Sequence, residues 1–169
     1  NFTQLDERDG TMTICFAGRL LREKGVYEFV SAARLLKQQG IQAHFLLVGD
    51  KDLKNPSSLK DEELKQLRDE GIVEILGYQK NIAEIYAGSH IICLPSYREG
   101  LPKSLVEAAA ASRAVVTTDV PGCRDVVVSG ETGILVPPRD AIALAAAIEK
   151  LAKNNQMRKR MGSSARDFA

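Results

Sequence analysis

The 169-residue sequence has no tryptophan, two histidines, three cysteines and no excess of charge of either sign. Lys and Arg total 23 against 22 Asp and Glu, so the chain has no overall field to attract nucleic acid or an acidic membrane. No apolar run approaches the roughly 20 residues that a membrane-spanning helix needs. The composition therefore argues against a nucleic-acid-binding or membrane-spanning protein, and it leaves room for a local basic site for a small anion.

The cysteines and histidines are scattered along the chain. Cys15, Cys93 and Cys123 have neither the spacing of a disulfide framework nor that of a zinc site, so we expect buried thiols in a reducing compartment. His44 and His90 stand alone beside strand-like apolar runs, where a structural role is expected. We predict no metal site and no catalytic histidine in this chain.

Hydrophobic residues make up 44% of the sequence, enough for one buried core. Short apolar runs predict strands at 13–17, 45–48, 73–76, 91–94, 114–117 and 133–136. Helices are expected at 26–36, 59–70, 82–87, 102–111, 144–151 (capped by Asp140) and 157–168, with a single turn at 122–127. This alternation predicts a doubly wound, Rossmann-like α/β domain, in which a mostly parallel six-stranded sheet carries helices on both faces.

Ligands of such sheets bind beyond the carboxyl ends of the strands, so we expect the chemistry in the strand-to-helix loops. The loop after the first strand, residues 18–25, has neither the glycine fingerprint of a dinucleotide-binding fold nor the Gly-Lys-Ser/Thr of a phosphate-binding P-loop. It places Arg19 at the end of the strand and Lys24 at the start of the next helix. Two cations beside free helix N–H groups would suit a diphosphate. The alternative is a solvated Arg and Lys that flank a tight turn.

The loop after the fourth strand and its helix hold two carboxylates eight positions apart. Pro102 suits the first position of a helix, which leaves Glu99 in the loop, and Gly100 lets the backbone approach a ligand. Glu107 stands alone in an Ala-rich helix, where its partner is either Lys103, four residues earlier, or the hydroxyls of a ligand. We hypothesise that Glu99 and Glu107 grip two parts of an elongated polyol. One face of this helix is expected to consist of Leu101, Leu105, Ala108, Ala109 and Ser112.

The loop after the fifth strand, residues 117–125, also contains glycine. Asp119 or Arg124 could reach a ligand from there. Turn chemistry alone explains Pro121 and Gly122.

Several short motifs occur in one order along the chain. They are Gly18-Arg19-Leu20, Lys24-Gly25, Val48-Gly49-Asp50, Glu99-Gly100-Leu101-Pro102, Glu107-Ala108 and the Thr-Gly-Ile-Leu-Val-Pro-Pro of 132–138. In this order they resemble glycosyltransferase family 4, whose members are retaining, sugar-nucleotide-dependent enzymes of the GT-B architecture. The resemblance covers nearly the whole chain and matches the carboxy-terminal, donor-binding half. It implies that residues 1–169 form a single nucleotide-sugar-binding domain and that the amino-terminal acceptor domain is absent from this chain. The start at Asn1 rather than Met agrees with the expectation of a piece of a longer protein.

Two longer strings, residues 96–105 and 116–124, are similar to a narrower bacterial group that builds O-antigen, capsule and glycoprotein glycans. The resemblance implies a UDP-sugar donor, with an N-acetylhexosamine as the transferred sugar and a lipid-linked acceptor on undecaprenyl diphosphate, or a saccharide acceptor. It also implies no cofactor and no metal, and a cytoplasmic protein or one that is peripheral at the inner face of the plasma membrane. The sequence departs from the family pattern at Lys51 and at 111–114, both outside the expected donor contacts.

The resemblance also implies a role for each motif residue. Arg19 and Lys24 would hold the donor diphosphate and stabilise the charge on the departing nucleotide without a metal. Glu99, the third expected catalytic residue, would face the transferred sugar, and Glu107 would accept hydrogen bonds from the ribose. The base would lie near Gly77-Tyr78. The other expected donor contacts are Gly18, Gly100, Leu101, Pro102, Lys103 and Ser104.

Three alternatives remain open at this stage. The first is a stand-alone nucleotide-sugar-binding module without catalysis. The second is a dinucleotide-dependent oxidoreductase domain, against which the missing glycine fingerprint counts. The third is a structural or interaction protein, but the sequence contains no repeat or heptad pattern that would support it. Because the acceptor site of a GT-B enzyme belongs to its amino-terminal domain, we expect this chain to bind nucleotide but to transfer no sugar alone.

Overall fold

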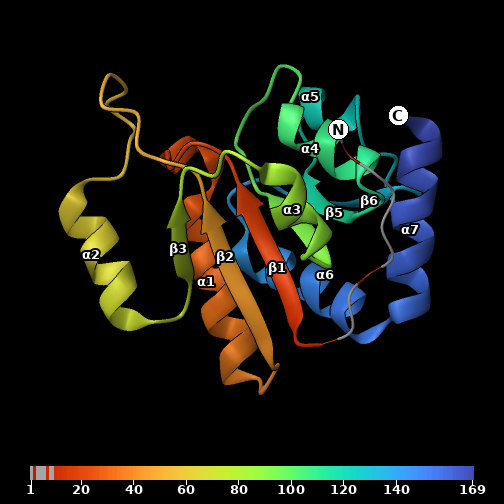
Figure 1. Ribbon diagram of the computed structural model, residues 1–169, viewed down its shortest axis with the longest axis horizontal. Coiled ribbons are helices and arrows are strands. Elements are labelled where there is room, and N and C mark those ends of the chain that lie inside the picture. Colours follow the sequence, from red (N-terminus) through yellow and green to blue (C-terminus); the bar gives the residue numbers. More distant parts are fainter. Residues whose placement is uncertain (1, 3–6, 8–9) are drawn as a thin grey trace.

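The computed structural model describes Phe2, Glu7 and residues 10–169. In this part of the chain, six strands form one sheet in the order β3-β2-β1-β4-β5-β6 (Figure 1). Every neighbouring pair is parallel. The strands are β1 Met12–Ala17, β2 Ala43–Val48, β3 Glu74–Gly77, β4 Ile91–Leu94, β5 Ala114–Thr118 and β6 Gly133–Val136. The predicted doubly wound, Rossmann-like sheet is therefore confirmed.

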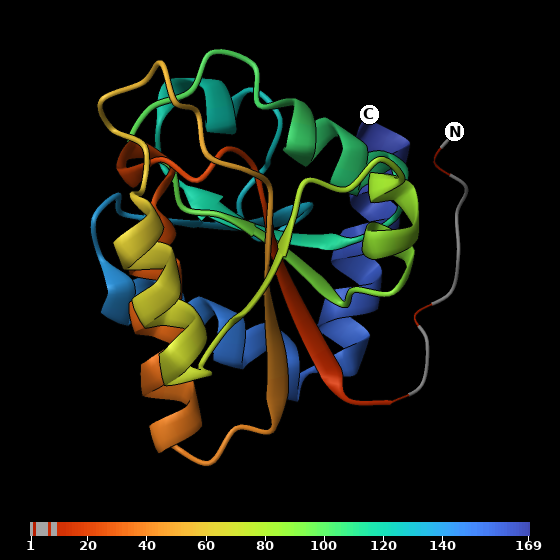
Figure 2. The ribbon, with the colours of Figure 1, turned by 60° about the vertical axis from the view of Figure 1, so that its left-hand side comes forward.

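Helices cover both faces of this sheet. Figure 2 shows α1, α2 and α6 on one side and α3, α4 and α7 on the other. The rings of Phe16 on β1 and Phe45 on β2 lie 5.8 and 6.0 Å from that of Phe29, which fixes α1 on their face. The helices are α1 Val26–Gln38, α2 Asp61–Glu70, α3 Ile82–Ala87, α4 Lys103–Ala110, α5 Pro121–Arg124, α6 Ala141–Lys153 and α7 Asn155–Phe168, with a 3₁₀ turn at Arg22–Lys24.

The start of α4 differs from the prediction in a way that matters for the site. Pro102 has an extended backbone (ψ 100°) and is the residue before the helix, not its first residue. Leu101 therefore lies outside the helix and is 72% exposed, so its predicted place on one helix face with Leu105 and Ala108 is wrong. An extended proline breaks the helical spacing, and a residue on its amino-terminal side cannot continue the helix face.

Most other local predictions hold. Asp140 caps α6 by accepting a hydrogen bond from the N–H of Ala143 at 2.8 Å. All three cysteines are buried thiols, and burial raises the pKa of Cys15 to about 12. His90 accepts a hydrogen bond at Nδ1 from the Thr13 N–H at 3.0 Å, which is a structural role.

Among the described residues, none of the helices combines the length and the apolarity that crossing a membrane would require. The same residues contain no cluster of three or more His, Cys, Asp or Glu side chains that could hold a metal ion.

Candidate functional site

The carboxyl ends of β1, β2 and β3 are held together by their backbones. The N–H of Gly18 donates to the carbonyl of Val48, and the N–H of Gly49 donates to the carbonyl of Gly77, both at 2.9 Å. Gly49 has a φ of +138°, and a Cβ there would lie only 1.8 Å from the carbonyl oxygen of Gly18. Glycine is therefore required at this position, and the three loops form one continuous wall.

A hollow of about 440 Å³ opens beyond this wall, between the loops and α4. We call it the strand-end hollow. Arg19, Lys51, Lys80 and Lys103 give it positive charge, and Asp50 and Glu107 are its carboxylates. Its remaining lining residues are Ala17, Gly18, Val48, Gly49, Tyr78, Gln79, Ile82, Tyr86 and Ser104.

A second hollow of about 400 Å³ adjoins the first. Arg19, Glu23, Lys24, Arg98, Glu99 and Gly100 line it, and we call it the Glu99 hollow. Because Arg19 lines both hollows, the two are joined at its side chain. Arg19, Lys24 and Glu99 thus line one hollow, and Glu107 lines the adjoining one.

Lys24 and Glu99 form the least exposed ion pair of this region. Lys24 Nζ lies 2.6 Å from Glu99 Oε1, and their side chains are 20% and 8% exposed. The Ser96 hydroxyl donates to the same oxygen at 2.6 Å, and the Ser96 carbonyl accepts from the Thr118 hydroxyl at 2.5 Å. Within the described chain, the hydrogen bonds to this carboxylate reach Oε1, so Oε2 is the oxygen available to a ligand.

Arg19 also has a carboxylate partner, which the sequence analysis missed. Its Nη1 lies 2.7 Å from Asp52 Oδ2, and both side chains are partly exposed. The Ser58 hydroxyl accepts a hydrogen bond from the Asp52 N–H at 3.0 Å and so fixes this loop. A partly exposed ion pair is worth about 0–1 kcal/mol, so Arg19 can exchange Asp52 for a more highly charged anion.

Glu107 meets both alternatives that the sequence left open. Lys103 Nζ lies 3.4 Å from its Oε1, although the Lys103 side chain is almost fully exposed. The Glu107 carboxylate also lines the strand-end hollow with Gly18, Arg19 and Tyr78. The solvated lysine leaves the carboxylate free to accept hydrogen bonds from a ligand hydroxyl.

The chain matches the sequence profile of the family described as Glycosyl transferases group 1 over residues 1–168. It belongs to this glycosyltransferase family. The N,N'-diacetylbacillosaminyl-diphospho-undecaprenol alpha-1,3-N-acetylgalactosaminyltransferase of Campylobacter jejuni is 34% identical over 152 residues, 90% of this chain and 38% of that protein. The capsular polysaccharide biosynthesis glycosyltransferase CapM of Staphylococcus aureus is 29% identical over 153 residues, 90% of this chain and 40% of that protein. The chain thus spans about two fifths of the length of these curated relatives.

Solved structures of glycosyltransferases share the fold. The Anabaena protein HepE, in complex with UDP and glucose, gives a TM-score of 0.81 at 23% identity, over 94% of this chain and 43% of that chain. The C-terminal domain of the glycosyl transferase group 1 family protein LpcC from Francisella tularensis gives a TM-score of 0.84 at 22% identity. The match covers 98% of this chain and 92% of that chain. The fold is one Rossmann-like half of the GT-B architecture, as the motifs predicted.

Not every predicted donor contact of this glycosyltransferase domain lines the two hollows. Gly100, Lys103, Ser104 and Tyr78 do. The carbonyl of Gly77 instead supports Gly49, so this residue shapes the wall. Two further predicted contacts lie elsewhere in the described structure, since Pro102 is buried ahead of α4 and Leu101 lines a separate apolar hollow with Val106 and Phe168.

Gly122 supports the site although the sequence analysis assigned it to turn chemistry. A Cβ at Gly122 would lie 1.9 Å from the carbonyl oxygen of Gly100 and 2.4 Å from that of Glu99. Only a residue without a side chain lets α5 pack against the Glu99 loop. Asp119 and Arg124, considered as ligand contacts, pair with each other at 3.0 Å and line neither hollow.

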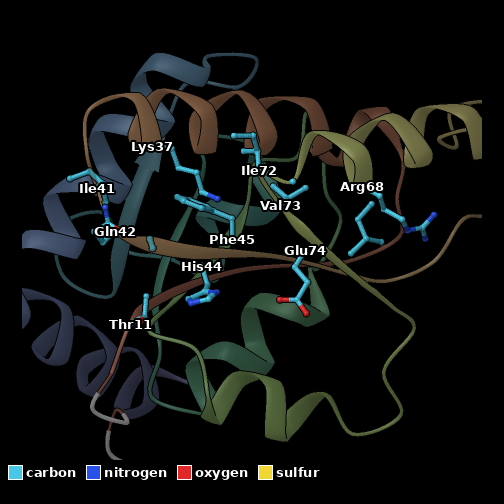
Figure 3. A pocket seen from close by; sticks show the side chains of 13 residues that line it. Thr11, Lys37, Ile41, Gln42, His44, Phe45, Arg68, Ile72, Val73 and Glu74 are labelled. Carbon is cyan, nitrogen blue, oxygen red and sulfur yellow. The ribbon is translucent and has the colours of Figure 1, made fainter.

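A hollow of about 880 Å³ lies at the opposite, amino-terminal edge of β2 and β3 (Figure 3). We call it the amino-edge hollow. Its charged and titratable lining residues are Lys37, His44, Arg68 and Glu74. Figure 3 shows the side chains of His44 and Glu74 on one side of the sheet and that of Lys37 on the other.

Proposed function

We propose that this chain is the donor-binding half of a retaining, metal-independent glycosyltransferase that uses a UDP-sugar. The transferred sugar is an N-acetylhexosamine, and the acceptor is a saccharide or a lipid-linked glycan on undecaprenyl diphosphate, made for a bacterial surface polysaccharide. The observation that carries this proposal is the convergence of Arg19, Lys24, Glu99 and Glu107 on two joined hollows. The Campylobacter relative named for an N-acetylgalactosaminyl transfer and the UDP complex of HepE support the choice of ligand.

The donor diphosphate lies, in this proposal, where the two hollows meet. Arg19 lines both, and Lys24 also lines the Glu99 hollow. The first N–H groups of α4 lack helical carbonyl partners, as at every helix start, and the preceding Gly100 and Leu101 add further N–H donors. These cations and N–H groups would bind the phosphate oxygens and stabilise the charge that develops on departing UDP, so no cofactor is required.

The two carboxylates are assigned to the two sugars of the donor. Glu99, held from one side by Lys24 and Ser96, would present Oε2 to the transferred sugar. Glu107 would accept hydrogen bonds from the ribose hydroxyls, and the base would lie beside exposed Tyr78. A GT-B acceptor domain in the whole protein would close the cleft, and transfer would take place in the cytoplasm or at the inner membrane face. The chain of 169 residues alone is expected to bind UDP and to transfer no sugar.

Calorimetric titration separates this proposal from its competitors. The 169-residue chain should bind UDP and should bind NAD at least tenfold more weakly. Preference for NAD would favour an oxidoreductase domain and overturn the proposal. The full-length protein, assayed with a panel of UDP-sugars and a lipid-linked acceptor, should transfer an N-acetylhexosamine most rapidly. Binding without any transfer by the full-length protein would instead favour a nucleotide-sugar-binding module without catalysis.

Glu107→Gln tests the ribose assignment. An amide accepts ribose hydroxyl hydrogen bonds less strongly than a carboxylate, so UDP affinity should fall by about 1 kcal/mol, or roughly fivefold. The affinity for inorganic pyrophosphate, which has no ribose, should stay the same. Equal losses for both ligands, measured by calorimetry, would contradict the assignment.

A further inference from the structure

A third hollow, of about 360 Å³, lies beside the Glu99 hollow. Three of its six lining residues are arginines, and we call it the arginine hollow. It is lined by Arg22, Glu23, Ser57, Tyr97, Arg98 and Arg139. Glu23 and Arg98 also line the Glu99 hollow, so the two hollows adjoin at these two side chains. Arg98 Nη2 lies 3.3 Å from Glu23 Oε2, and the Arg98 side chain is 84% exposed, so this boundary is weakly held.

Arg139 occupies an unusual position at this hollow. Its φ of +59° lies in the left-handed region, which residues other than glycine rarely adopt. Its guanidinium carbon lies 4.6 Å from the centre of the Tyr97 ring. Among the described residues, Arg139 has no carboxylate partner. Stacking on a ring uses the face of the guanidinium and leaves its N–H donors at the edge available to an anion.

Two hydrogen bonds hold Tyr97 in place beside Arg139. The Tyr97 hydroxyl donates to Glu28 Oε1 at 2.6 Å, and the backbone N–H of Tyr97 donates to the Glu23 carbonyl at 2.9 Å. Burial, together with the hydrogen bond to Glu28, raises the pKa of Tyr97 to about 12, so the phenol stays protonated and keeps this bond. The Arg139 guanidinium therefore packs against a ring that is itself held by hydrogen bonds.

Arg22 is the second anchored cation. Its Nη2 lies 2.6 Å from Glu63 Oε1, and its Nη1 donates to the Ser58 carbonyl at 3.4 Å. Among the described residues, the carboxylates bound to lining side chains are Glu23 on Arg98, Glu28 on Tyr97 and Glu63 on Arg22. The lining contains three arginines and one glutamate; Arg22 is paired with Glu63 and Arg98 with Glu23, so within the described chain Arg139 is the lining arginine without a carboxylate partner.

We propose that the arginine hollow is a second anion site, separate from the donor diphosphate, and that it takes a diphosphate group. Arginine binds phosphate oxygens through paired N–H donors, and two anchored arginines with a third, loosely held one can surround such a group. Because the hollow adjoins the Glu99 hollow, a diphosphate bound here would lie beside the donor. The diphosphate of a second substrate and free pyrophosphate share this chemistry.

Calorimetry with inorganic pyrophosphate tests the proposal on the 169-residue chain. Pyrophosphate should still bind when UDP is saturating, and Arg139→Gly should then weaken it at least fivefold while the UDP affinity stays within twofold. Glycine suits the φ of Arg139, so the melting temperature of this variant should be unchanged or higher. Arg124→Gln, at an arginine paired with Asp119 outside the hollow, is the matched control and should change neither affinity.

Two outcomes would overturn the proposal: loss of pyrophosphate binding under saturating UDP, or an Arg139→Gly variant that binds pyrophosphate like its parent. Geranyl diphosphate identifies the source of the group. Arg139-dependent binding of geranyl diphosphate beside UDP supports the diphosphate of a second substrate, whereas binding of inorganic pyrophosphate alone supports the free anion. Arg139-dependent pyrophosphate binding by a chain that does not bind UDP would confirm this site and refute the proposed donor function.

Discussion

The two edges of the sheet differ in how their side chains are held. The amino-edge hollow, at about 880 Å³, is about twice the volume of the strand-end hollow or of the Glu99 hollow. In the described chain, however, none of Lys37, His44, Arg68 and Glu74 at the amino edge takes part in an ion pair or a side-chain hydrogen bond. At the carboxyl edge, Arg19, Lys24 and Glu107 each have a partner of opposite charge.

Individual glycines near the two groups of hollows differ in the same direction, although Gly77 and Gly100 at the carboxyl edge also have open space and Gly162 packs against the backbone of Ser112 near the start of β5. Gly40 and Gly71, near the amino edge, have open space where a Cβ would stand. Gly25, Gly49 and Gly122, at the carboxyl edge, would each place a Cβ within 2.1 Å of a backbone oxygen. Close backbone packing fixes the positions of the loops, and a site must be positioned in advance to bind a ligand well. Volume alone therefore does not mark the proposed donor site, whereas fixed polar groups and tightly packed loops set the carboxyl edge apart.

Substituting alanine for glycine at each edge should give the largest difference. Gly49→Ala places a methyl group 1.8 Å from the Gly18 carbonyl oxygen, at a φ that alanine rarely adopts, so it should cost about 3 kcal/mol or more of unfolding free energy. Gly40→Ala, at a φ of +82° in open space, should cost only about 1–2 kcal/mol. Urea unfolding measures both losses. Equal losses would show that the carboxyl edge is no more tightly packed than the amino edge.

Removing one arginine from each edge should give the next largest effect, on binding. Arg19→Ala should weaken UDP by about 1.5–3 kcal/mol, or roughly 10- to 150-fold, because it removes charge-assisted hydrogen bonds to the diphosphate. Arg68→Ala, in the amino-edge hollow, should leave UDP affinity within twofold. Both changes are measured by calorimetry, with uridine as the ligand that lacks phosphates.

Uridine affinity should change little in either arginine variant. A loss of UDP affinity in Arg68→Ala as large as that in Arg19→Ala would contradict the proposed binding of the nucleotide at the carboxyl edge.

The sequence predicted the sheet because its strands are buried runs. In β4, for example, all four residues are buried, and such a continuous apolar run predicts a buried strand from the local sequence alone. The turn geometry was harder to predict, as the displaced Leu101 shows. The position of the Leu101 side chain follows from the extended backbone of Pro102, whereas residue spacing alone predicts that both residues are helical.

The partners within the site lay beyond the reach of local patterns. Motif order indicated Arg19 and Lys24, but their partners are 33 and 75 positions away in the sequence. Asp52 lies in a loop without periodicity, and Gly122 lies in an ordinary Pro-Gly turn. Only the packing of that turn against Gly100 explains why a glycine is needed there.

The smallest predicted effect is a pH-dependent difference in unfolding free energy between variants of two glutamates, Glu63 and Glu74. Glu63 accepts hydrogen bonds from the Tyr27 hydroxyl, the Lys60 N–H and Arg22, and these hold its pKa below its usual range. A lowered carboxyl pKa stabilises the fold at pH values above the ordinary pKa of about 4.3, and the contribution is lost as the pH falls through the folded value. Glu63→Gln should therefore cost about 1 kcal/mol at pH 7, and this cost should shrink from about pH 5 downward.

Glu74→Gln at the amino edge is the matched control, because Glu74 has no partner among the described residues. Urea unfolding of both variants and of the parent between pH 7 and pH 3 gives the differences. The cost of Glu74→Gln should stay near zero over this range. A cost of Glu63→Gln that does not change with pH would mean that the carboxylate charge of Glu63 contributes nothing, and that Arg22 at the carboxyl edge is held by packing rather than by its ion pair.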